Sequence, residues 1–294
     1  MIDGHTQLYG FYANPAKHSL SPLMHNLSFK TLGINATYLA FEIPEHFEQA
    51  AAAIRALDLG GINLSHPFKT AIIDYLDELT PTAQLLGAVN TVTNRNGYLI
   101  GDSTDGAGFI AGLAQHQQSV TAKTVSVLGA GGAGLAVIAA VAQNQAKVIH
   151  VFKRQNATFD KIVQRCHEIG DATQVEIQVH PYADQAEMTR ILAQSDYLIN
   201  TTNIGMGQAQ DQLPLPFTTL EALAPAAIVC DLIYVPKATR LLQQATALGH
   251  TCYNGLDMLI YQGALAFEEW TGEEMPVPQV TKALYEKLYA TVKI

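Results

Sequence analysis

The residues that most clearly indicate a binding site are three glycines at the spacing G-x-G-x-x-G: Gly129, Gly131 and Gly134. They follow the apolar run 125–128 and precede the almost wholly apolar run 135–142. In a nucleotide-binding turn the first glycine permits a tight turn, and the second lets the backbone approach a pyrophosphate. The third lets helix and strand pack closely. Free N–H groups at the helix start then face the anion. The pattern therefore predicts a dinucleotide site rather than a structural glycine turn.

Four polar clusters precede this turn, each near the expected carboxyl end of a strand, where open α/β sheets bind ligands. The first cluster contains Ser19 and Ser21 before a proline. Two hydroxyls beside a helix N-terminus suit a carboxylate, because the hydroxyls donate hydrogen bonds and the helix end is partly positive. The alternative is that Ser21 alone serves as the helix N-cap.

The second cluster joins Asn63, Ser65 and Lys69 just after a short apolar strand. A lysine here could give a proton to a carbonyl oxygen as a hydride reaches its carbon, although most helix lysines are simply solvated. His66 precedes a proline and is more typical of a turn. Asn90, in the third cluster, is a weak signal by itself.

The fourth cluster runs from Gly101 to Gly106 and includes Asp102, Thr104 and Asp105. Asp102 or Thr104 could cap the following helix. If Asp105 lies near the lysine of the second cluster, its carboxylate would keep the ammonium charged and oriented.

These residues must be positioned by alternating strands and helices, which favour parallel sheets with helices on both faces. Predicted strands cover 8–12, 36–43, 60–64, 90–94, 98–101, 125–128, 147–152, 175–179, 197–200 and 228–232. Predicted helices cover 21–32, 45–57, 69–77, 82–86, 105–116, 135–142, 157–169, 183–193, 239–248, 257–270 and 280–292. Asn96-Gly97 predicts a hairpin turn between two of the strands. Two α/β halves result, with a boundary near 105–120 and the nucleotide turn in the second half.

The composition excludes several classes of protein. The chain has 294 residues, 48% hydrophobic and 15% charged, which indicates a globular protein of one large or two ordinary domains. Its net charge of −9, without a basic cluster, argues against a nucleic-acid partner. The three widely spaced cysteines form no metal or redox motif, so we expect reduced thiols. With no leader pattern and no apolar run of membrane-spanning length, we expect a cytoplasmic protein without a membrane partner.

Taken in order, the motifs resemble the shikimate dehydrogenase family, including its quinate/shikimate branch, over nearly the whole chain. The residues that carry the resemblance are Ser19-Leu20-Ser21-Pro22, Asn63 with Pro67-Phe68-Lys69, Ala88-Val89-Asn90-Thr91, Gly101-Asp102 with Thr104-Asp105-Gly106, Gly129-Ala130-Gly131-Gly132-Ala133, Asp231-Leu232-Ile233-Tyr234 with Pro236 and Thr239, and Gly255 with Met258-Leu259 and Gln262. The resemblance implies a substrate domain, 1–104 plus 258–294, and a Rossmann-like NAD(P)-binding domain, 105–257. The C-terminal helices would return to the first domain.

The resemblance also implies reversible NAD(P)-dependent reduction of 3-dehydroshikimate to shikimate, in the chorismate route to aromatic amino acids. Lys69 and Asp105 would be the catalytic pair, and Ser19 and Ser21 would bind the substrate carboxylate. The other substrate-binding residues would be Asn63, Ser65, Asn90, Tyr234 and Gln262. The cofactor would be bound by Gly129, Ala130, Gly131, Gly132, Ala133, Lys153, Arg154, Thr201, Gly205, Met206 and Gly255.

The chain departs from the family pattern at three places. Ser65 stands where many members have threonine, which would relax selection between shikimate and the bulkier quinate. Ser103 replaces a usual asparagine. After the second nucleotide strand, Lys153, Arg154 and Asn156 replace the Asn-Arg-Thr or Asn-Arg-Ser of strict NADP members and the aspartate of the dual-specificity branch.

Cofactor choice follows from the last departure. No acid is present to bind an NAD ribose, whereas Lys153 and Arg154 could receive a 2′-phosphate. Arg154 could equally stack on the adenine of either cofactor. We expect NADP, with NAD as the alternative.

We expect Lys69 to stabilise a developing alkoxide and Asp105 to orient it, without a metal ion. The alternatives are an enzyme acting mainly on quinate and a non-catalytic NAD(P)-binding regulator. Retention of both Lys69 and Asp105 argues against the regulator. The sequence leaves open whether the protein is a monomer or a homodimer.

Overall fold

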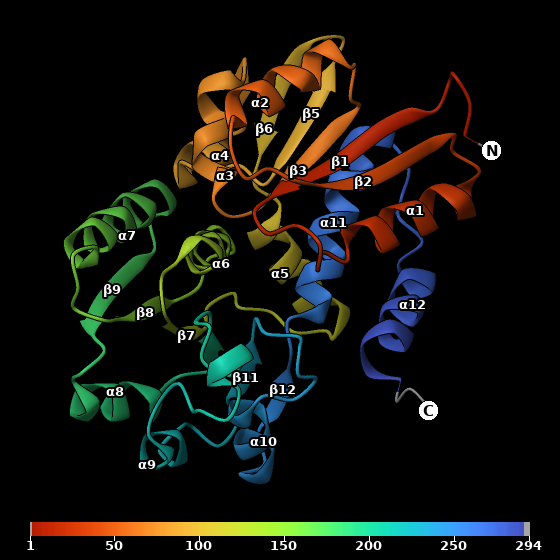
Figure 1. Cartoon of the computed structure of the whole chain (residues 1–294). Helices are drawn as coiled ribbons and strands as arrows, with labels where there is room; N and C mark the ends of the chain where they lie inside the picture. The colour runs from red at the N-terminus through yellow and green to blue at the C-terminus, as the bar shows by residue number, and fades with distance from the viewer. Residues whose placement is uncertain (1, 291–294) are drawn as a thin grey trace. The chain divides into compact units, whose positions relative to one another are not determined.

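The structure is a computed structural model that describes residues 2–290 (Figure 1). The chain forms two compact units. Unit 1 comprises the residues up to Gly108 together with those from Ile260 onward, and unit 2 runs from Phe109 to Leu259. Both division points fall inside helices, α5 (Asp105–Gln115) and α11 (Leu256–Thr271). The domain limits expected from the sequence fall near the starts of these same two helices.

Unit 1 is built on a six-stranded sheet with the order β2-β1-β3-β5-β6-β4. Its strands are β1 (Gln7–Ala13), β2 (Ala36–Glu42), β3 (Gly61–Leu64), β4 (Glu78–Leu79), β5 (Thr91–Arg95) and β6 (Tyr98–Asp102). Its other elements are α1 (Ser21–Leu32), α2 (Phe47–Ala56), α3 (Phe68–Ala71), the 3-10 helix η1 (Ile72–Tyr75), α4 (Pro81–Leu86), the start of α5, most of α11, and α12 (Val277–Tyr289). The strand β4 was not predicted, and the helix expected over 69–77 is divided into α3 and η1.

A single reversed strand brings the polar clusters of unit 1 to one edge of the sheet. β5 runs antiparallel to β3 and to β6, whereas the other neighbouring pairs are parallel. The predicted hairpin turn joins β5 to β6, with positive φ angles at Asn96 (55°) and Gly97 (89°). Asn63 at the end of β3 therefore pairs with Thr91 at the start of β5, and Thr91 pairs with Asp102 at the end of β6.

This reversal corrects one expectation. The Asn90 cluster precedes a strand instead of following one. It still lies at the common edge, because the amino end of an antiparallel strand meets the carboxyl ends of its neighbours.

Helices cover both faces of the unit 1 sheet (Figure 1). On one face, side chains of α2, α3 and α4, including Ile54 and Phe68, pack on Ile62 and other apolar side chains of the strands. On the other face, rings of α1 and α11 gather around the sheet, with Phe29 against Phe267 at a ring-centroid distance of 5.2 Å. α12 packs on α1, and α12 and the part of α11 from Ile260 onward belong to unit 1. The predicted end of the last helix, 292, lies outside the described residues.

Unit 2 is a six-stranded, wholly parallel sheet with the order β12-β11-β10-β7-β8-β9. Its strands are β7 (Thr124–Leu128), β8 (Val148–Lys153), β9 (Glu176–Pro181), β10 (Tyr197–Asn200), β11 (Ile228–Asp231) and β12 (Thr251–Tyr253). Its helices, besides the end of α5 and the start of α11, are α6 (Gly132–Gln143), α7 (Phe159–Thr173), α8 (Gln185–Leu192), the 3-10 helix η2 (Gly207–Ala209), α9 (Phe217–Glu221) and α10 (Arg240–Ala247). β12, η2 and α9 were not predicted.

This strand order is that of the doubly wound dinucleotide-binding fold, in which ligands bind where the order reverses. The reversal lies between β7 and β10, directly at the glycine turn. α6 and α7 lie on one face of the sheet and α8, α9 and α10 on the other (Figure 1). Within residues 2–290, no helix is both long enough and apolar enough to cross a membrane.

Candidate active site

The proposed catalytic pair is formed in unit 1. Lys69, on α3 after β3, and Asp105, at the start of α5 after β6, meet at 2.6 Å between Nζ and Oδ2. The Lys69 side chain is 26% exposed and that of Asp105 is 14% exposed. The pair is thus shielded on most sides but open to a ligand, unlike the usual solvated lysine on a helix.

Asn90 fixes the second oxygen of Asp105. Its Nδ2 donates to Asp105 Oδ1 at 2.8 Å and to Thr104 Oγ1 at 3.0 Å. Its Oδ1 accepts from the Thr104 backbone N–H at 2.8 Å and from Thr91 Oγ1 at 3.1 Å. Both amide hydrogens of Asn90 are therefore used inside unit 1, and one of them holds the Asp105 carboxylate.

Asn63 is buried next to this cluster, with 4% of its surface exposed. Its Nδ2 donates to Thr91 Oγ1 at 3.1 Å and to the Asn90 carbonyl at 3.3 Å, and its Oδ1 accepts from the Tyr38 hydroxyl at 2.8 Å. Since a carbonyl oxygen has two lone pairs, Oδ1 keeps one for a ligand hydroxyl.

The paired serines are not used as a helix cap. The N-cap of α1 is Leu20, without a side-chain hydrogen bond, and Ser21 is the first helical residue. The alternative role of Ser21 as N-cap is therefore wrong. Ser19 Oγ accepts from the Ser21 backbone N–H at 3.3 Å, and the side chain of Ser21 hydrogen-bonds to Tyr38. Ser65 is half-buried just after β3, and its hydroxyl has no hydrogen-bond partner in the described part of the chain.

The remaining predicted substrate residues lie on two different units. Gln262 lies on α11 within unit 1, where a Cβ on Gly108 would stand 2.5 Å from the Gln262 backbone nitrogen. Only glycine permits this approach of α5 to α11. Tyr234 follows β11 in unit 2, and burial raises its pKa. Ser103 is buried and His66 is exposed.

The glycine turn in unit 2 has the geometry expected of a nucleotide site. Gly129 has a φ of +93°, and a Cβ on Gly134 would stand 2.5 Å from Thr201 Oγ1. These two positions therefore require glycine for the turn and for close packing. Gly131 is the N-cap residue of α6, and among residues 2–290 no side chain hydrogen-bonds to the first N–H groups of this helix. A Cβ on Gly131 or on Gly132 would meet nothing within 4 Å. The free helix start and the open space above it fit a pyrophosphate.

A pocket of about 360 Å³ lies over this turn. It is lined by Gly129, Ala130, Gly131, Phe152, Lys153, Arg154, Thr158, Tyr182, Thr201, Thr202, Asn203 and Ile204. Six of the eleven predicted cofactor residues line it. Gly132, Ala133, Gly205, Met206 and Gly255 are not among its lining residues.

The two cations after β8 have different environments. Lys153 is only 9% exposed, and its Nζ donates to Asn156 Oδ1 at 2.8 Å and to the Arg154 carbonyl at 3.3 Å. Burial, and secondarily the charge of Arg154, lowers the Lys153 pKa. Arg154 is exposed, and no hydrogen bond of its guanidinium occurs among the described residues. Arg154 is therefore the cation that is free to meet a ligand, and Lys153 mainly orders the loop.

Loop 201–207, after β10, is anchored by buried polar residues. Asn200 Oδ1 accepts from Thr202 Oγ1 at 2.7 Å, and its Nδ2 donates to Asp231 Oδ1 at 3.0 Å. Asp231 Oδ2 accepts from Thr239 Oγ1 at 2.7 Å. Burial raises the pKa of Asp231 to about 6, against the effect of these donors. Gly205 packs on Thr239 with a φ of +117°, whereas Met206 is 48% exposed.

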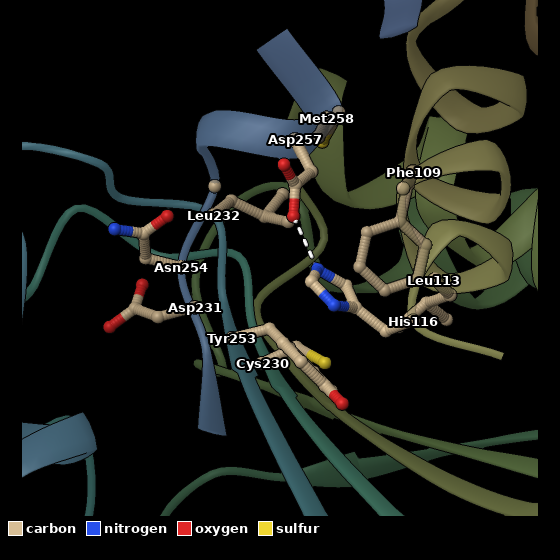
Figure 2. Close-up of a pocket in the computed structure, with 12 residues that line it drawn as sticks. Phe109, Leu113, His116, Cys230, Asp231, Leu232, Tyr253, Asn254, Asp257 and Met258 are labelled. Carbon is tan, nitrogen blue, oxygen red and sulfur yellow. Dashed lines mark hydrogen bonds and ion pairs between the residues drawn. The ribbon is translucent and has the colours of Figure 1, made fainter. Parts of the chain in front are cut away.

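A second pocket lies within unit 2, between the end of α5, the start of α11 and the ends of β11 and β12 (Figure 2). His116 points toward Asp257, with 2.7 Å between Nε2 and Oδ2, and its ring stacks on Tyr253 at 4.4 Å. The pocket volume is about 20 Å³, which is room for about one water molecule. Gly255 lines this pocket, and a Cβ on it would stand 1.9 Å from the Leu232 carbonyl oxygen. Close packing on Leu232 therefore requires glycine at position 255.

Sequence reasoning missed several polar residues that organise these sites. They are Tyr38, Thr91, Thr104, Asn200, Thr158 and Tyr182. Thr91 and Thr104 lie inside motifs that were recognised for their neighbours. Asn200 ends a strand beside the glycine turn, which is a signal that could have been used. Tyr38 lies in the middle of β2 and gives no signal that distinguishes it from an ordinary core tyrosine.

A doubly wound nucleotide-binding unit, carried on one chain with a unit that presents a shielded lysine–carboxylate pair, defines an NAD(P)-linked oxidoreductase. The profile of the "Shikimate dehydrogenase substrate binding domain" matches residues 11–92, and that of the "Shikimate 5'-dehydrogenase C-terminal domain" matches residues 255–285. The chain belongs to the shikimate dehydrogenase family.

Curated relatives and solved structures agree on this family. The chain is 42% identical to shikimate dehydrogenase (NADP(+)) of Latilactobacillus sakei over 98% of each chain. It is 43% identical to the enzyme of the same name from Streptococcus sanguinis, over 98% of this chain and 99% of that one. The crystal structure of Listeria monocytogenes shikimate 5-dehydrogenase with shikimate and NAD superposes with a TM-score of 0.93, at 39% identity, covering 96% of this chain and 98% of that chain. The predicted family, fold class and oxidoreductase class are confirmed.

Proposed function

We propose that the protein interconverts 3-dehydroshikimate and shikimate with NADP as the preferred cofactor. The observation that carries the proposal is the shielded Lys69–Asp105 ion pair, held at 2.6 Å at the sheet edge where Asn63 and Asn90 also lie. The names of the relatives support the substrate and the cofactor. A non-catalytic regulator would have no need for a lysine fixed in this way.

In the reduction, the Lys69 ammonium donates a proton to the carbonyl oxygen and stabilises the negative charge that develops there. When bound, the nicotinamide supplies the hydride that reaches the carbonyl carbon. Asp105 holds and aims the Lys69 ammonium, and Asn90 keeps Asp105 from rotating. In the oxidation the same residues act in reverse, with Lys69 or Asp105 receiving the proton.

The substrate carboxylate would be bound by Ser19 and Ser21 at the N-terminus of α1, where the helix dipole favours an anion. Ser65 offers a free hydroxyl, and Asn63 offers its remaining oxygen lone pair to a ring hydroxyl. We propose that Tyr234 and Gln262 complete the substrate site.

For the cofactor, Gly131 and Gly132 would receive the pyrophosphate on the N–H groups of α6. Arg154 would meet the 2′-phosphate of NADP or stack on adenine. Lys153 would support the same loop, because its amine is bonded to Asn156. No carboxylate lines this pocket to bind the ribose hydroxyl of NAD.

The first test measures initial rates of oxidation of shikimate and of quinate, each with NADP⁺ and with NAD⁺. We expect the highest kcat/KM for shikimate with NADP⁺. A higher value for quinate would assign the protein to quinate metabolism instead. Cofactor binding without turnover of either acid would support the regulator.

The second test replaces the proposed proton donor, with Lys69→Ala compared with Lys17→Ala. Lys17 is a matched control, because it also pairs with a carboxylate (Glu42, 3.6 Å) in unit 1 but is 86% exposed. We expect Lys69→Ala to lower kcat by about 10²–10⁴-fold, with a much smaller change in shikimate affinity. Unchanged turnover would remove Lys69 from the mechanism.

A further inference from the structure

Tyr38 lies beneath the proposed substrate-binding residues of unit 1 and is completely buried on β2. Its hydroxyl donates to Asn63 Oδ1 at 2.8 Å and accepts a hydrogen bond from the side chain of Ser21. Burial keeps the pKa of Tyr38 well above its ordinary value, so the hydroxyl retains its proton. One buried hydroxyl thus joins a residue proposed to bind the substrate carboxylate to one proposed to bind the ring.

The hydrogen bonds beyond Asn63 run in one direction. Asn63 Nδ2 donates to Thr91 Oγ1 at 3.1 Å, and Thr91 Oγ1 donates to Asn90 Oδ1 at 3.1 Å. Asn90 Nδ2 donates to Asp105 Oδ1 at 2.8 Å. Along this route the successive donors point toward the Asp105 carboxylate, which also accepts from Lys69. Because the chain ends on an anion, its polarity is fixed, and each amide is held in one of its two flip orientations.

The ring of Tyr38 is held by an unusual neighbour. His25, on α1, stacks on Tyr38 with ring centroids 4.3 Å apart and an interplanar angle of 13°. His25 is fully buried, and neither of its ring nitrogens has a hydrogen-bond partner among the described residues. Burial lowers its pKa to about 3, so it is neutral. His25 therefore acts on Tyr38 as a flat ring that leaves the hydroxyl to Ser21 and Asn63.

We propose that Tyr38 is a positioning residue for the substrate: its buried hydroxyl fixes Ser21 and the Asn63 amide in the orientation that binds the cyclic hydroxy-acid. Without that hydroxyl, Asn63 Oδ1 loses its internal donor, so the amide is held only through Nδ2 by Thr91 and the Asn90 carbonyl. Ser21 loses its internal acceptor. Both changes weaken substrate binding, although Tyr38 does not itself contact the substrate. The inference rests on the proposed function, since Ser21 and Asn63 matter only if the site takes such an acid.

The experiment compares Tyr38→Phe with Tyr9→Phe. Tyr9 is a matched control, because it is the register partner of Tyr38 on β1 and is also buried. No hydrogen bond of the Tyr9 hydroxyl occurs in the described part of unit 1. The KM of each variant is measured for shikimate, or for quinate if the wild type prefers it, and for NADP⁺.

We expect Tyr38→Phe to raise the KM for the acid roughly tenfold, with a smaller change in kcat and an NADP⁺ KM within about twofold of the wild type. Tyr9→Phe should match the wild type in all three constants. Equal KM values for the acid in the two variants would overturn the proposal. An inactive wild type would overturn the proposed function and this inference together, whereas an active wild type with equal variants overturns this inference alone.

A double-mutant cycle tests the route through Ser21. Ser21→Ala should raise the KM for the acid less in the Tyr38→Phe background than in the wild type, because the two residues act as one unit. Equal fold-changes in both backgrounds would count against the coupling. If Tyr38→Phe does not fold, His25→Leu replaces it: removal of the stacked ring should raise the same KM, and no change would overturn the proposal.

Discussion

We expect Glu269 to make the stability of the protein depend on pH. Its side chain lies on α11, where Oε2 accepts from Thr93 Oγ1 at 3.4 Å and the carboxyl group hydrogen-bonds to Asp102. Burial first, and then the charge and hydrogen bond of Asp102, raise the pKa of Glu269 from 4.5 to about 8. The native state therefore holds this proton more tightly than the unfolded chain does.

The sign of the effect follows from that difference. Between about pH 4.5 and pH 8 the native protein keeps the proton and the unfolded chain loses it, so the free energy of unfolding falls as the pH rises through this window. Each pKa unit corresponds to about 1.4 kcal/mol, which sets an upper limit of about 5 kcal/mol. Because the Glu269 side chain is only partly buried, we expect the free energy of unfolding to fall by roughly 2–4 kcal/mol across this window.

The assay is urea unfolding of the wild type and of Glu269→Gln at several values between pH 5 and pH 9. We expect Glu269→Gln to gain stability relative to the wild type as the pH rises, because its neutral amide can still donate to Asp102. Glu268→Gln is the control, since Glu268 is the exposed neighbour on the same helix. Parallel pH curves for the wild type and Glu269→Gln would refute the reasoning.

Two further predictions concern unit 2. Gly134→Ala should weaken NADP⁺ binding several-fold and destabilise the protein by about 1–3 kcal/mol, because the new Cβ would stand 2.5 Å from Thr201 Oγ1. Cofactor titration measures the first effect and urea unfolding the second. Adding Thr201→Ala should recover part of the lost stability and affinity. Arg154→Gln should raise the KM for NADP⁺ about 10–100-fold and leave that for NAD⁺ nearly unchanged. Lys161→Gln, an exposed cation on α7, serves as the control, and an equal loss with both cofactors would show that Arg154 acts on adenine instead of the phosphate.

Much of the site could be predicted because its residues follow short-range rules. The glycine turn requires positive φ at Gly129 and close packing at Gly134, and only glycine satisfies both. Lys69 and Asp105 lie just after the strands β3 and β6. Parallel strands place such residues at one edge, so their meeting at 2.6 Å was foreseeable.

Other features depend on tertiary structure that no local pattern carries. β4 has two residues and β12 three, too few to show a period. The hydrogen bond of the Ser21 side chain is made to Tyr38, which is 17 residues further along the chain. The two residues come together only when β2 has joined the sheet. Asn156 was considered as a cofactor determinant, but its carbonyl oxygen accepts from Lys153 and orders the loop.

The division of the chain inside α5 and α11 affects how the protein is made. A ribosome completes all of unit 2 before it has delivered α11 beyond Leu259 and the whole of α12. Until then unit 1 lacks Phe267, which packs on Phe29, and Trp270, whose ring nitrogen donates to the Val92 carbonyl at 3.1 Å. During synthesis the aromatic face of the first sheet is therefore covered by α1 alone. The later half of the chain can reach its native structure first, while the earlier half waits for the last helices to emerge.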